Sequence, residues 1–440
     1  MQTQSLNRSY VLVLFLALFS IGCSKSDDPT PDPPQPAPSI TGFSPSDAAA
    51  GEQVIITGTN FNVNASGNTV KFNGTTATIS AATATQLTVT VPAGVTSGKL
   101  TVTVNNQSAT SSADFNLLGM VSTIAGSGVL GFANGIGSAA QFGHAPDLAL
   151  DAAGNIYVAD ATSSFAVRKI TPAGVVTTLA GGGVSGFADG VGTAARFGVL
   201  MGIAVDGSGN VYVVDLGNNR IRKITPEGVV STIGGNGEPD YLDGPAAISK
   251  FNYPQGVVAD NTGNVYVADA GNSRIRKISG GMVSTVAGDG VAGFWDTNVA
   301  SARFNNPTKI KIDGAGNLIV LDQGNHRIRK ISNGTVSTIA GSGTAGYLDG
   351  PVATAQFNAP AGLGIDQNGN IYVGDQINQR IRKISTTGVV TTVAGTGVGG
   401  FEDGNTNNAK FNSPNGLDIT ATGIIYVADN QNFRIRKISF

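Results

Sequence analysis

Few side chains in this sequence could carry out acid–base, nucleophilic or metal chemistry. The chain contains two histidines, His144 and His326, and a single cysteine, Cys23. It has no His-x-x-x-His or Cys-x-x-Cys spacing, so the usual ligand patterns of a transition-metal site are missing. Asp147 and Asp418 could join His144 in an imitation of a metal site, but the sequence supplies no further strong ligand. We therefore predict a non-catalytic protein that needs no cofactor.

The composition is that of a globular chain rich in turns. Of its 440 residues, 41% are hydrophobic, 13% are charged and 61 are glycine. The formal net charge is only -2, whereas nucleic-acid-binding proteins usually carry a basic excess. We therefore expect no nucleic-acid partner.

The N-terminus has the architecture of an export signal. The apolar run 11–22 follows Arg8, is too short to span a bilayer and ends in small residues. The stretch Ser20-Ile21-Gly22-Cys23 resembles the lipobox of bacterial lipoproteins, although Ser20 stands where leucine is commoner. This resemblance implies a signal peptide over 1–22 and a lipid on Cys23 that attaches the protein to a membrane. The alternative is a plain secretory signal with a coincidental cysteine.

Residues 23–38 are rich in Ser, Asp and Pro and cannot bury a core, so we expect an extended tether. Residues 25–28, Lys-Ser-Asp-Asp, resemble the surface-export signals of Bacteroidota lipoproteins. The expected localisation is therefore the outer membrane, with the protein exposed at the cell surface as a monomer.

Residues 39–118 are strand-like throughout and are punctuated by turn residues, which predicts a two-sheet sandwich. The stretches Ile40–Pro45, Val54–Phe61 and Val70–Gly74 resemble the TIG (IPT) family of immunoglobulin-like domains. In secreted bacterial proteins such domains are usually spacers or binding accessories, and we expect a spacer here.

The remainder, 119–440, is one unit used six times. A Val-Ser/Thr-Thr run recurs at regular intervals, beginning at Val121, Val176, Val230, Val283, Val336 and Val390. Each unit holds four candidate strands, which favours a β-propeller blade over a solenoid coil. The chain enters with the fourth strand of a blade and ends after a third strand. Val121–Ala125 should therefore complete the last blade and close the ring.

The unit resembles the NHL repeat through Asp260–Asn264, Val265–Asp269 and Asn272–Ile278 and their counterparts in the other copies. The resemblance implies an all-β chain that ends in a six-bladed propeller.

Features present in nearly every copy are interpreted as scaffold. An aspartate ends the second strand, and an arginine follows at a fixed offset; we predict hydrogen-bonded Asp–Arg pairs that brace each blade. The arginines assigned to these pairs are Arg220, Arg274, Arg327, Arg380 and Arg434. The aromatics of the long loops are predicted to plug the space beneath those loops, namely Phe132, Phe187, Tyr241, Phe294, Tyr347 and Phe401.

Candidate ligand-binding residues are those at which the copies differ. The loop between second and third strands varies at one position, which holds Phe165, His326 and Phe433 in three of the copies. Trp295, the one tryptophan of the chain, lies in a long loop. The first strands should line the central channel, and there four charges replace small or apolar residues: Asp147, Lys309, Lys311 and Asp418.

Aromatic rings beside polar groups suit stacking on sugar rings or on the side chains of a peptide. We therefore predict a surface lipoprotein whose propeller binds an extracellular glycan. One alternative is a protein–protein interaction scaffold at the cell surface. The other is an enzyme like the metal-dependent lactonases and lyases that share the six-bladed fold, which hold a metal at the channel mouth.

Overall fold

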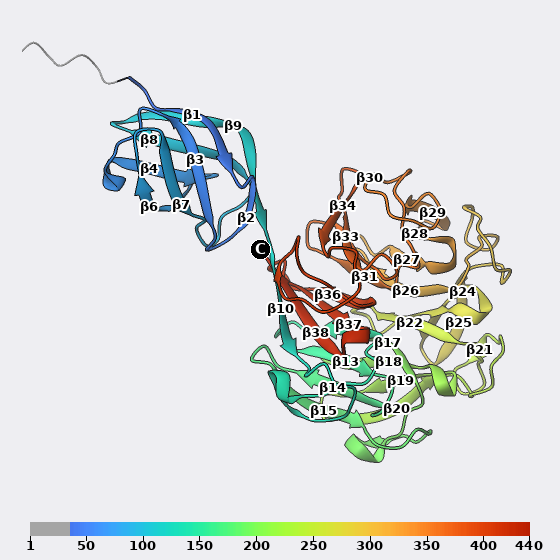
Figure 1. Ribbon diagram of the computed structural model, residues 1–440. Helices are drawn as coiled ribbons and strands as arrows, with labels where there is room; N and C mark the ends of the chain where they lie inside the picture. The colour runs from blue at the N-terminus through green and yellow to red at the C-terminus, as the bar shows by residue number, and fades with distance from the viewer. Residues whose placement is uncertain (1–35) are drawn as a thin grey trace, which may run out of the picture.

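The structure, a computed structural model, describes residues 36–440. Cys23, the predicted signal peptide and most of the predicted tether lie outside this range. Figure 1 shows two all-β bodies joined by one extended segment. The predicted fold class is therefore confirmed. Within the described range, no helix is long and apolar enough to cross a membrane.

The smaller body is a sandwich of two sheets. Its strands alternate between the core and solvent, as β3 (Gln53–Thr59) does at every residue, so the inward side chains of both sheets form one core. One sheet has the order β1 (Ser39–Ser44), β3, β7 (Gln86–Thr90), β6 (Thr78–Ala82). The other has the order β2 (Asp47–Ala49), β9 (Gln107–Leu118), β8 (Gly98–Val104), β4 (Asn68–Phe72), β5 (Thr75–Thr76).

The larger body is a ring of six antiparallel blades, numbered here in chain order. From the channel outward, the four main strands of blades 1 to 3 are β12 (Asp147–Leu150), β13 (Ile156–Asp160), β14 (Ala166–Ile170), β15 (Val175–Gly181); β17 (Leu200–Val205), β18 (Val211–Asp215), β19 (Arg220–Ile224), β20 (Val229–Gly234); and β22 (Pro254–Ala259), β23 (Val265–Asp269), β24 (Arg274–Ser279), β25 (Met282–Ala287). Those of blades 4 to 6 are β26 (Pro307–Ile312), β27 (Leu318–Asp322), β28 (Arg327–Ser332), β29 (Thr335–Ala340); β31 (Gly362–Ile365), β32 (Ile371–Asp375), β33 (Arg380–Ile384), β34 (Val389–Ala394); and β36 (Pro414–Ile419), β37 (Ile425–Asp429), β38 (Arg434–Ser439), β10 (Met120–Ala125).

The ring closes as the sequence predicts. Strand β10 pairs antiparallel with β38, with Val121 opposite Ile438, so the first propeller strand completes the last blade. Only Gly119 separates β9 of the sandwich from β10. A Cβ at Gly119 would lie 2.8 Å from the Phe440 ring, so this link passes tightly over the chain end.

The apolar cores of the propeller lie between neighbouring blades. One such cluster joins Tyr157 and Ala159 of blade 1 to Ile203, Val211 and Val213 of blade 2. Because both faces of a blade are covered, the second strands are apolar and buried along their whole length, as in β13 and β18.

The loops divide the ring into two faces. Because strands alternate in direction, the loops that join blades and those that join second to third strands emerge at one end of the channel, called here the mouth. The tight turns emerge at the other end, called the base.

Each long loop between blades was expected to hold a short helical turn. Such turns are assigned only in the first two of these loops, as η2 (Gly137–Ala139) and η3 (Gly192–Ala194). In five blades the loop instead adds a two-residue fifth strand to the outer edge, namely β11 (Gly135–Ile136), β16 (Gly190–Val191), β21 (Gly244–Pro245), β30 (Gly350–Pro351) and β35 (Gly404–Asn405).

Candidate functional site

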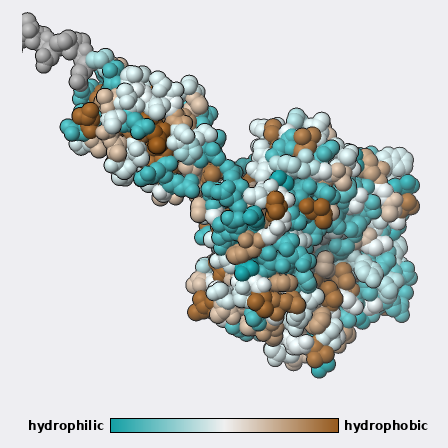
Figure 2. All heavy atoms as spheres, in the orientation of Figure 1, coloured by the Kyte–Doolittle hydropathy of each residue, from teal (hydrophilic) through white to brown (hydrophobic). Residues whose placement is uncertain are grey.

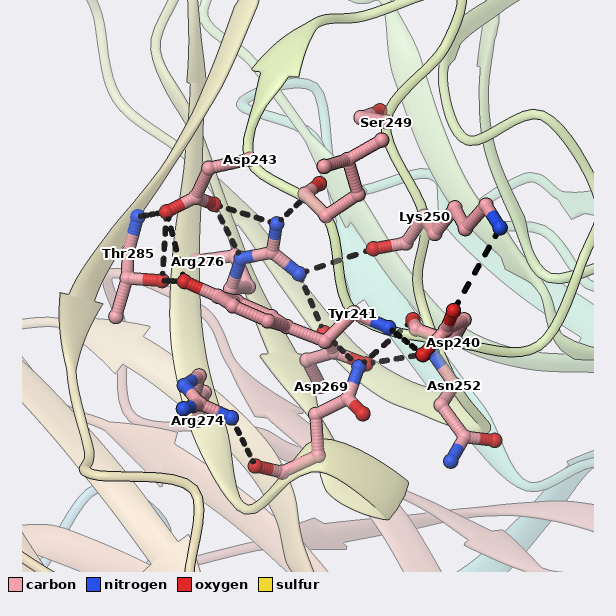
Figure 3. Close-up of polar contacts among 12 residues, drawn as sticks. Asp240, Tyr241, Asp243, Ser249, Lys250, Asn252, Asp269, Arg274, Arg276 and Thr285 are labelled. Carbon is pink, nitrogen blue, oxygen red and sulfur yellow. Dashed lines mark hydrogen bonds and ion pairs between the residues drawn. The ribbon is translucent and has the colours of Figure 1, made fainter.

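A fully buried arginine braces each blade. In blade 3, Arg276 Nη1 donates to Asp269 Oδ2 at 2.7 Å and Nε donates to Asp243 Oδ1 at 3.0 Å (Figure 3). Asp243 also accepts from the backbone and hydroxyl of Thr285. The buried set is Arg168, Arg222, Arg276, Arg329, Arg382 and Arg436. Charge-assisted bonds on several sides explain why a guanidinium can be buried here.

The predicted Asp–Arg pairing therefore exists, but the arginine assigned to it was wrong. Arg274 starts β24 at its partly exposed end, where it donates to the Asp289 carbonyl at 2.9 Å. Its guanidinium also stacks 4.0 Å from the centre of the Tyr241 ring. The carboxylate of Asp269 instead receives Arg276, two residues further along the strand, whose side chain lies inside the blade.

The loop aromatics belong to this brace. The Tyr241 ring lies against the guanidinium groups of Arg274 and Arg276 and keeps 38% of its surface exposed. The fully buried plugs are the phenylalanines that follow these loops, at Phe142, Phe197, Phe251, Phe304, Phe357 and Phe411. The sequence therefore predicted the plugs but placed them on the wrong aromatic of each loop.

Blade 1 holds its arginine with fewer partners. Arg168 binds Asp160 at 2.9 Å, but Asn134 replaces the second carboxylate, and within residues 36–440 Arg168 Nε has no hydrogen-bond partner. Ser164 also stands where blade 3 has Asn272, whose amide donates to Asp269. Burial raises the pKa of Asp160 to about 6, against the opposing effects of Ser164 and Arg168.

The four predicted channel charges neutralise one another in pairs. Lys309 of blade 4 reaches across the channel to Asp147 of blade 1, with 2.9 Å between Nζ and Oδ2. Lys311 pairs in the same way with Asp418 of blade 6 at 3.0 Å. Burial lowers the pKa of Lys309, and Asp147 opposes this effect.

These pairs connect blades that are not neighbours. Asp147 also accepts the Ile203 N–H of blade 2, and Asp418 accepts the Leu150 N–H of blade 1. At the level of the first pair the other four blades carry glycine; a Cβ at Gly362 would lie 2.0 Å from the Asn415 carbonyl oxygen. The structure thus accounts for all four charges as cross-braces of the channel, without a ligand.

His326 has a defined structural role. It adopts a left-handed backbone conformation, and its Nδ1 accepts the N–H of Ala359 in the next blade at 3.1 Å. Asn219 and Gln379, at the same place in blades 2 and 5, accept the equivalent N–H groups through their side-chain oxygens. Burial lowers the pKa of His326, although Asp375 opposes the shift. The histidine is therefore the neutral acceptor of a loop-to-loop hydrogen bond.

Phe433 and Phe165 occupy this position in blades 6 and 1, where a phenyl ring cannot accept such a bond. The His144 ring instead lies beside Phe433, with centroids 5.3 Å apart and planes tilted by 59°. The His144 backbone is bonded to Ala161 and Thr162, in the loop that carries Phe165. The three rings are partly exposed and form one strip at the mouth, called here the aromatic arc.

The opposite side of the mouth carries amide groups. Gln255 Nε2 donates to Asn306, Asn306 donates to Gln323, and Gln323 donates to the carbonyl of Pro360. Gln376 continues this polar strip through a 2.7 Å bond to Ser413. We call these residues of blades 3 to 6 the amide arc.

Trp295 is not part of either arc. It lies in the loop that passes along the outer edge of blade 4, half a ring away from blade 1, and 53% of its surface is exposed. The Arg303 guanidinium lies 5.7 Å from its ring centre. Trp295 thus forms a separate aromatic surface.

Two sequence profiles match the chain. The profile of the IPT/TIG domain matches residues 38–117, and that of the NHL repeat matches 251–278 and 411–438. The chain joins an IPT/TIG domain to an NHL-repeat propeller. Both resemblances seen in the sequence are therefore confirmed.

A curated relative is Protein SUPPRESSOR OF QUENCHING 1, chloroplastic, of Arabidopsis thaliana, which is 32% identical over 283 residues. The match covers 59% of this chain but only 27% of that protein. A structural genomics protein of unknown function from Bacteroides thetaiotaomicron superposes with a TM-score of 0.58 at 21% identity, over 92% of this chain and 99% of its own. An auxiliary nutrient binding protein from the same organism gives 0.57 at 18%, over 92% and 98%. At these identities the structures share the fold.

The NHL propeller offers no evident metal centre. Among residues 36–440, no three His, Cys, Asp or Glu side chains gather closely enough to hold an ion. Asp147 and Asp418 face lysines, and His144 packs beside Phe433.

The amide arc was missed by the sequence analysis. Its signal lies one or two residues before the first strand of each blade, where the copies read His144, Val199, Tyr253, Asn306, Ala359 and Ser413. Aligning the NHL copies at this position would have shown polar residues in blades 4 and 6 and the histidine in blade 1.

Proposed function

We propose that the mouth of the NHL propeller binds an extracellular glycan between the aromatic arc and the amide arc. The observation that carries the proposal is the break in sixfold symmetry at Phe165 and Phe433, where the loop-capping acceptor is replaced by a partly exposed ring. A glycan offers hydroxyl groups to amides and apolar ring faces to aromatics, and the mouth supplies both kinds of partner.

The channel braces support a binding site at the surface of the mouth. The side chains of Asp147 and Lys309 are each only 10% exposed, so the ion pair crosses the channel below the loops. A ligand would therefore rest on the mouth and not thread the channel. The likeness of the fold to an auxiliary nutrient binding protein is compatible with this role.

A protein partner is the main competing proposal. Figure 2 shows apolar side chains on the visible face of the propeller as small separate clusters among polar ones. Broad protein interfaces usually need a more continuous apolar centre, so the distribution on this face favours recognition through a few rings and many polar groups.

We further propose that the protein is an outer-membrane lipoprotein held by Cys23, with the IPT/TIG domain as a spacer. The single-residue link at Gly119 and the 2.8 Å bond from Asn407 Nδ2 to Asp47 Oδ2 would hold the propeller in a fixed orientation to its spacer. Metabolic labelling with a fatty-acid analogue tests the anchor. Label in the wild type and none in Cys23→Ala is expected; equal label in both proteins would refute it.

A glycan array tests the ligand class. The matched variants are Phe165→Asn and Phe433→Asn, because asparagine already occupies this left-handed position at Asn219 and tolerates it well. Selective glycan binding that both variants weaken would support the proposal. The absence of any glycan ligand, together with capture of a surface protein, would favour the competing proposal.

A further inference from the structure

The base of the propeller contains a departure of its own, remote from the mouth. In five blades the second strand carries a tyrosine as its second residue: Tyr157, Tyr212, Tyr266, Tyr372 and Tyr426. In blade 4 this residue is Ile319. Because the position faces the next blade, the substitution changes the contact between blades 4 and 5.

Blade 2 shows what the tyrosine does. The Tyr212 ring packs against Val257 and Val265 of blade 3, and its hydroxyl donates to Asp206 Oδ2 at 3.0 Å. Lys223 Nζ lies 5.7 Å from the ring centre. In blades 1 and 5 the corresponding hydroxyl bonds are 3.2 and 3.4 Å long. A phenol ring, a carboxylate and an ammonium group thus form one repeated arrangement.

Blade 4 keeps the carboxylate and the ammonium but lacks the phenol. Lys330 Nζ lies 2.9 Å from Asp313 Oδ2, the atom equivalent to the one that accepts the tyrosine hydroxyl elsewhere. Partial burial opposes the shift, but hydrogen bonds from Asn317 and Lys330 hold the pKa of Asp313 at about 2. Asp313 is therefore an ionised acceptor at neutral pH.

A groove opens where the ring is missing. Between blades 4 and 5 it encloses about 420 Å³ and reaches inward to Asp313 and Ile365 past Ile319. The equivalent groove between blades 2 and 3 encloses about 360 Å³ and has the Tyr212 side chain in its wall. The larger groove is lined by isoleucines of both blades, with Asp313 and Lys330 as its charged groups.

We propose that this groove binds a small para-substituted phenol in the position that tyrosine fills in the other blades. The ring would pack on Ile319 and Ile371, and the hydroxyl would donate to Asp313. Lys330, whose side chain is 32% exposed, would turn to lie over the ring as its counterparts do. Space left by a missing aromatic side chain can hold an aromatic molecule, and a bond to a carboxylate adds selectivity for the phenol.

Titration of the full chain with p-cresol and with toluene, followed by NMR or calorimetry, tests this site. We expect saturable one-to-one binding of p-cresol and about tenfold weaker binding of toluene, which lacks the hydroxyl. The variant Ile319→Tyr refills the groove with the chain's own phenol and should abolish binding of both. Absence of p-cresol binding to the wild type, or unchanged binding to Ile319→Tyr, would overturn the proposal.

The variant Tyr372→Ile provides the converse test, because blade 5 retains Asp366 and Lys383. It should create a second site and raise the stoichiometry from one to two. A folded Tyr372→Ile protein that still binds one p-cresol would contradict the claim that the missing tyrosine makes the site. If this variant does not fold, the result with Ile319→Tyr decides the question.

Discussion

The side of the ring where the chain closes and the side opposite to it are built from the same repeat but satisfy it differently. In blade 3, Arg276 meets the two carboxylates of Asp269 and Asp243. In blade 1, Arg168 meets the carboxylate of Asp160 and the amide of Asn134. The opposite side therefore follows the repeat more completely.

The mouth shows the same contrast. In blades 4 and 5, His326 and Gln379 tie each loop to the next, whereas Phe433 and Phe165 on the closure side do not. The difference teaches that the repeated interactions hold the ring, and that side chains become available for a ligand where those interactions are thinned. Departures of this kind from local consistency are expected at functional sites.

The largest expected effect comes from removing the buried arginines. Arg276→Ala strands two carboxylates and should lower the free energy of unfolding by about 3–5 kcal/mol. Arg168→Ala strands one and should cost clearly less. Urea unfolding followed by the fluorescence of Trp295 reports on the propeller alone, because this is the only tryptophan. Equal losses in the two variants would break the comparison.

Restoring the missing carboxylate in blade 1 should have a smaller, opposite effect. Asn134→Asp gives Arg168 Nε an acceptor and adds a charge-assisted bond, so we expect about 1–2 kcal/mol of stabilisation in the same unfolding experiment. The reverse change, Asp243→Asn in blade 3, is the matched control and should destabilise by a similar amount. A variant Asn134→Asp no more stable than the wild type would show that blade 1 is not deficient.

The smallest effect concerns the loop bond of His326. Its folded-state pKa is lowered, so the stability that this residue contributes is complete above the unfolded pKa near 6.5 and is lost as the pH falls. We expect a loss of about 1 kcal/mol or less on acidification. His326→Gln, which copies the residue at Gln379 of blade 5, should keep the bond and remove this pH dependence. Identical pH profiles of unfolding in the two proteins would refute the role.

Most of the fold could be predicted because its signals are local and repeated. The alternating strands and regular turns predict blades, and the phase of the repeat predicts that Val121 pairs beside Ile438. The arginine of the brace was misassigned because Arg274 and Arg276 lie two residues apart on one strand, and the sequence does not show which end of that strand is buried.

The site could be predicted only in part. Comparing copies singled out Phe165 and Phe433, because each aromatic interrupts a polar series at one position. The pairing of Asp147 with Lys309 joins blades on opposite sides of the ring, so no spacing along the chain indicates it. The amide arc escaped notice because its members come from different positions of the repeat.

The central claim is that the aromatic arc, and not the outer rim at Trp295, binds the ligand. The direct test is the dissociation constant of the best array glycan for Phe433→Asn and Trp295→Ala, measured side by side by calorimetry. The account predicts that Phe433→Asn weakens binding by about 1–3 kcal/mol while Trp295→Ala leaves it near the wild-type value. Binding that is lost in Trp295→Ala and unchanged in Phe433→Asn would contradict the account and move the site to the edge of blade 4.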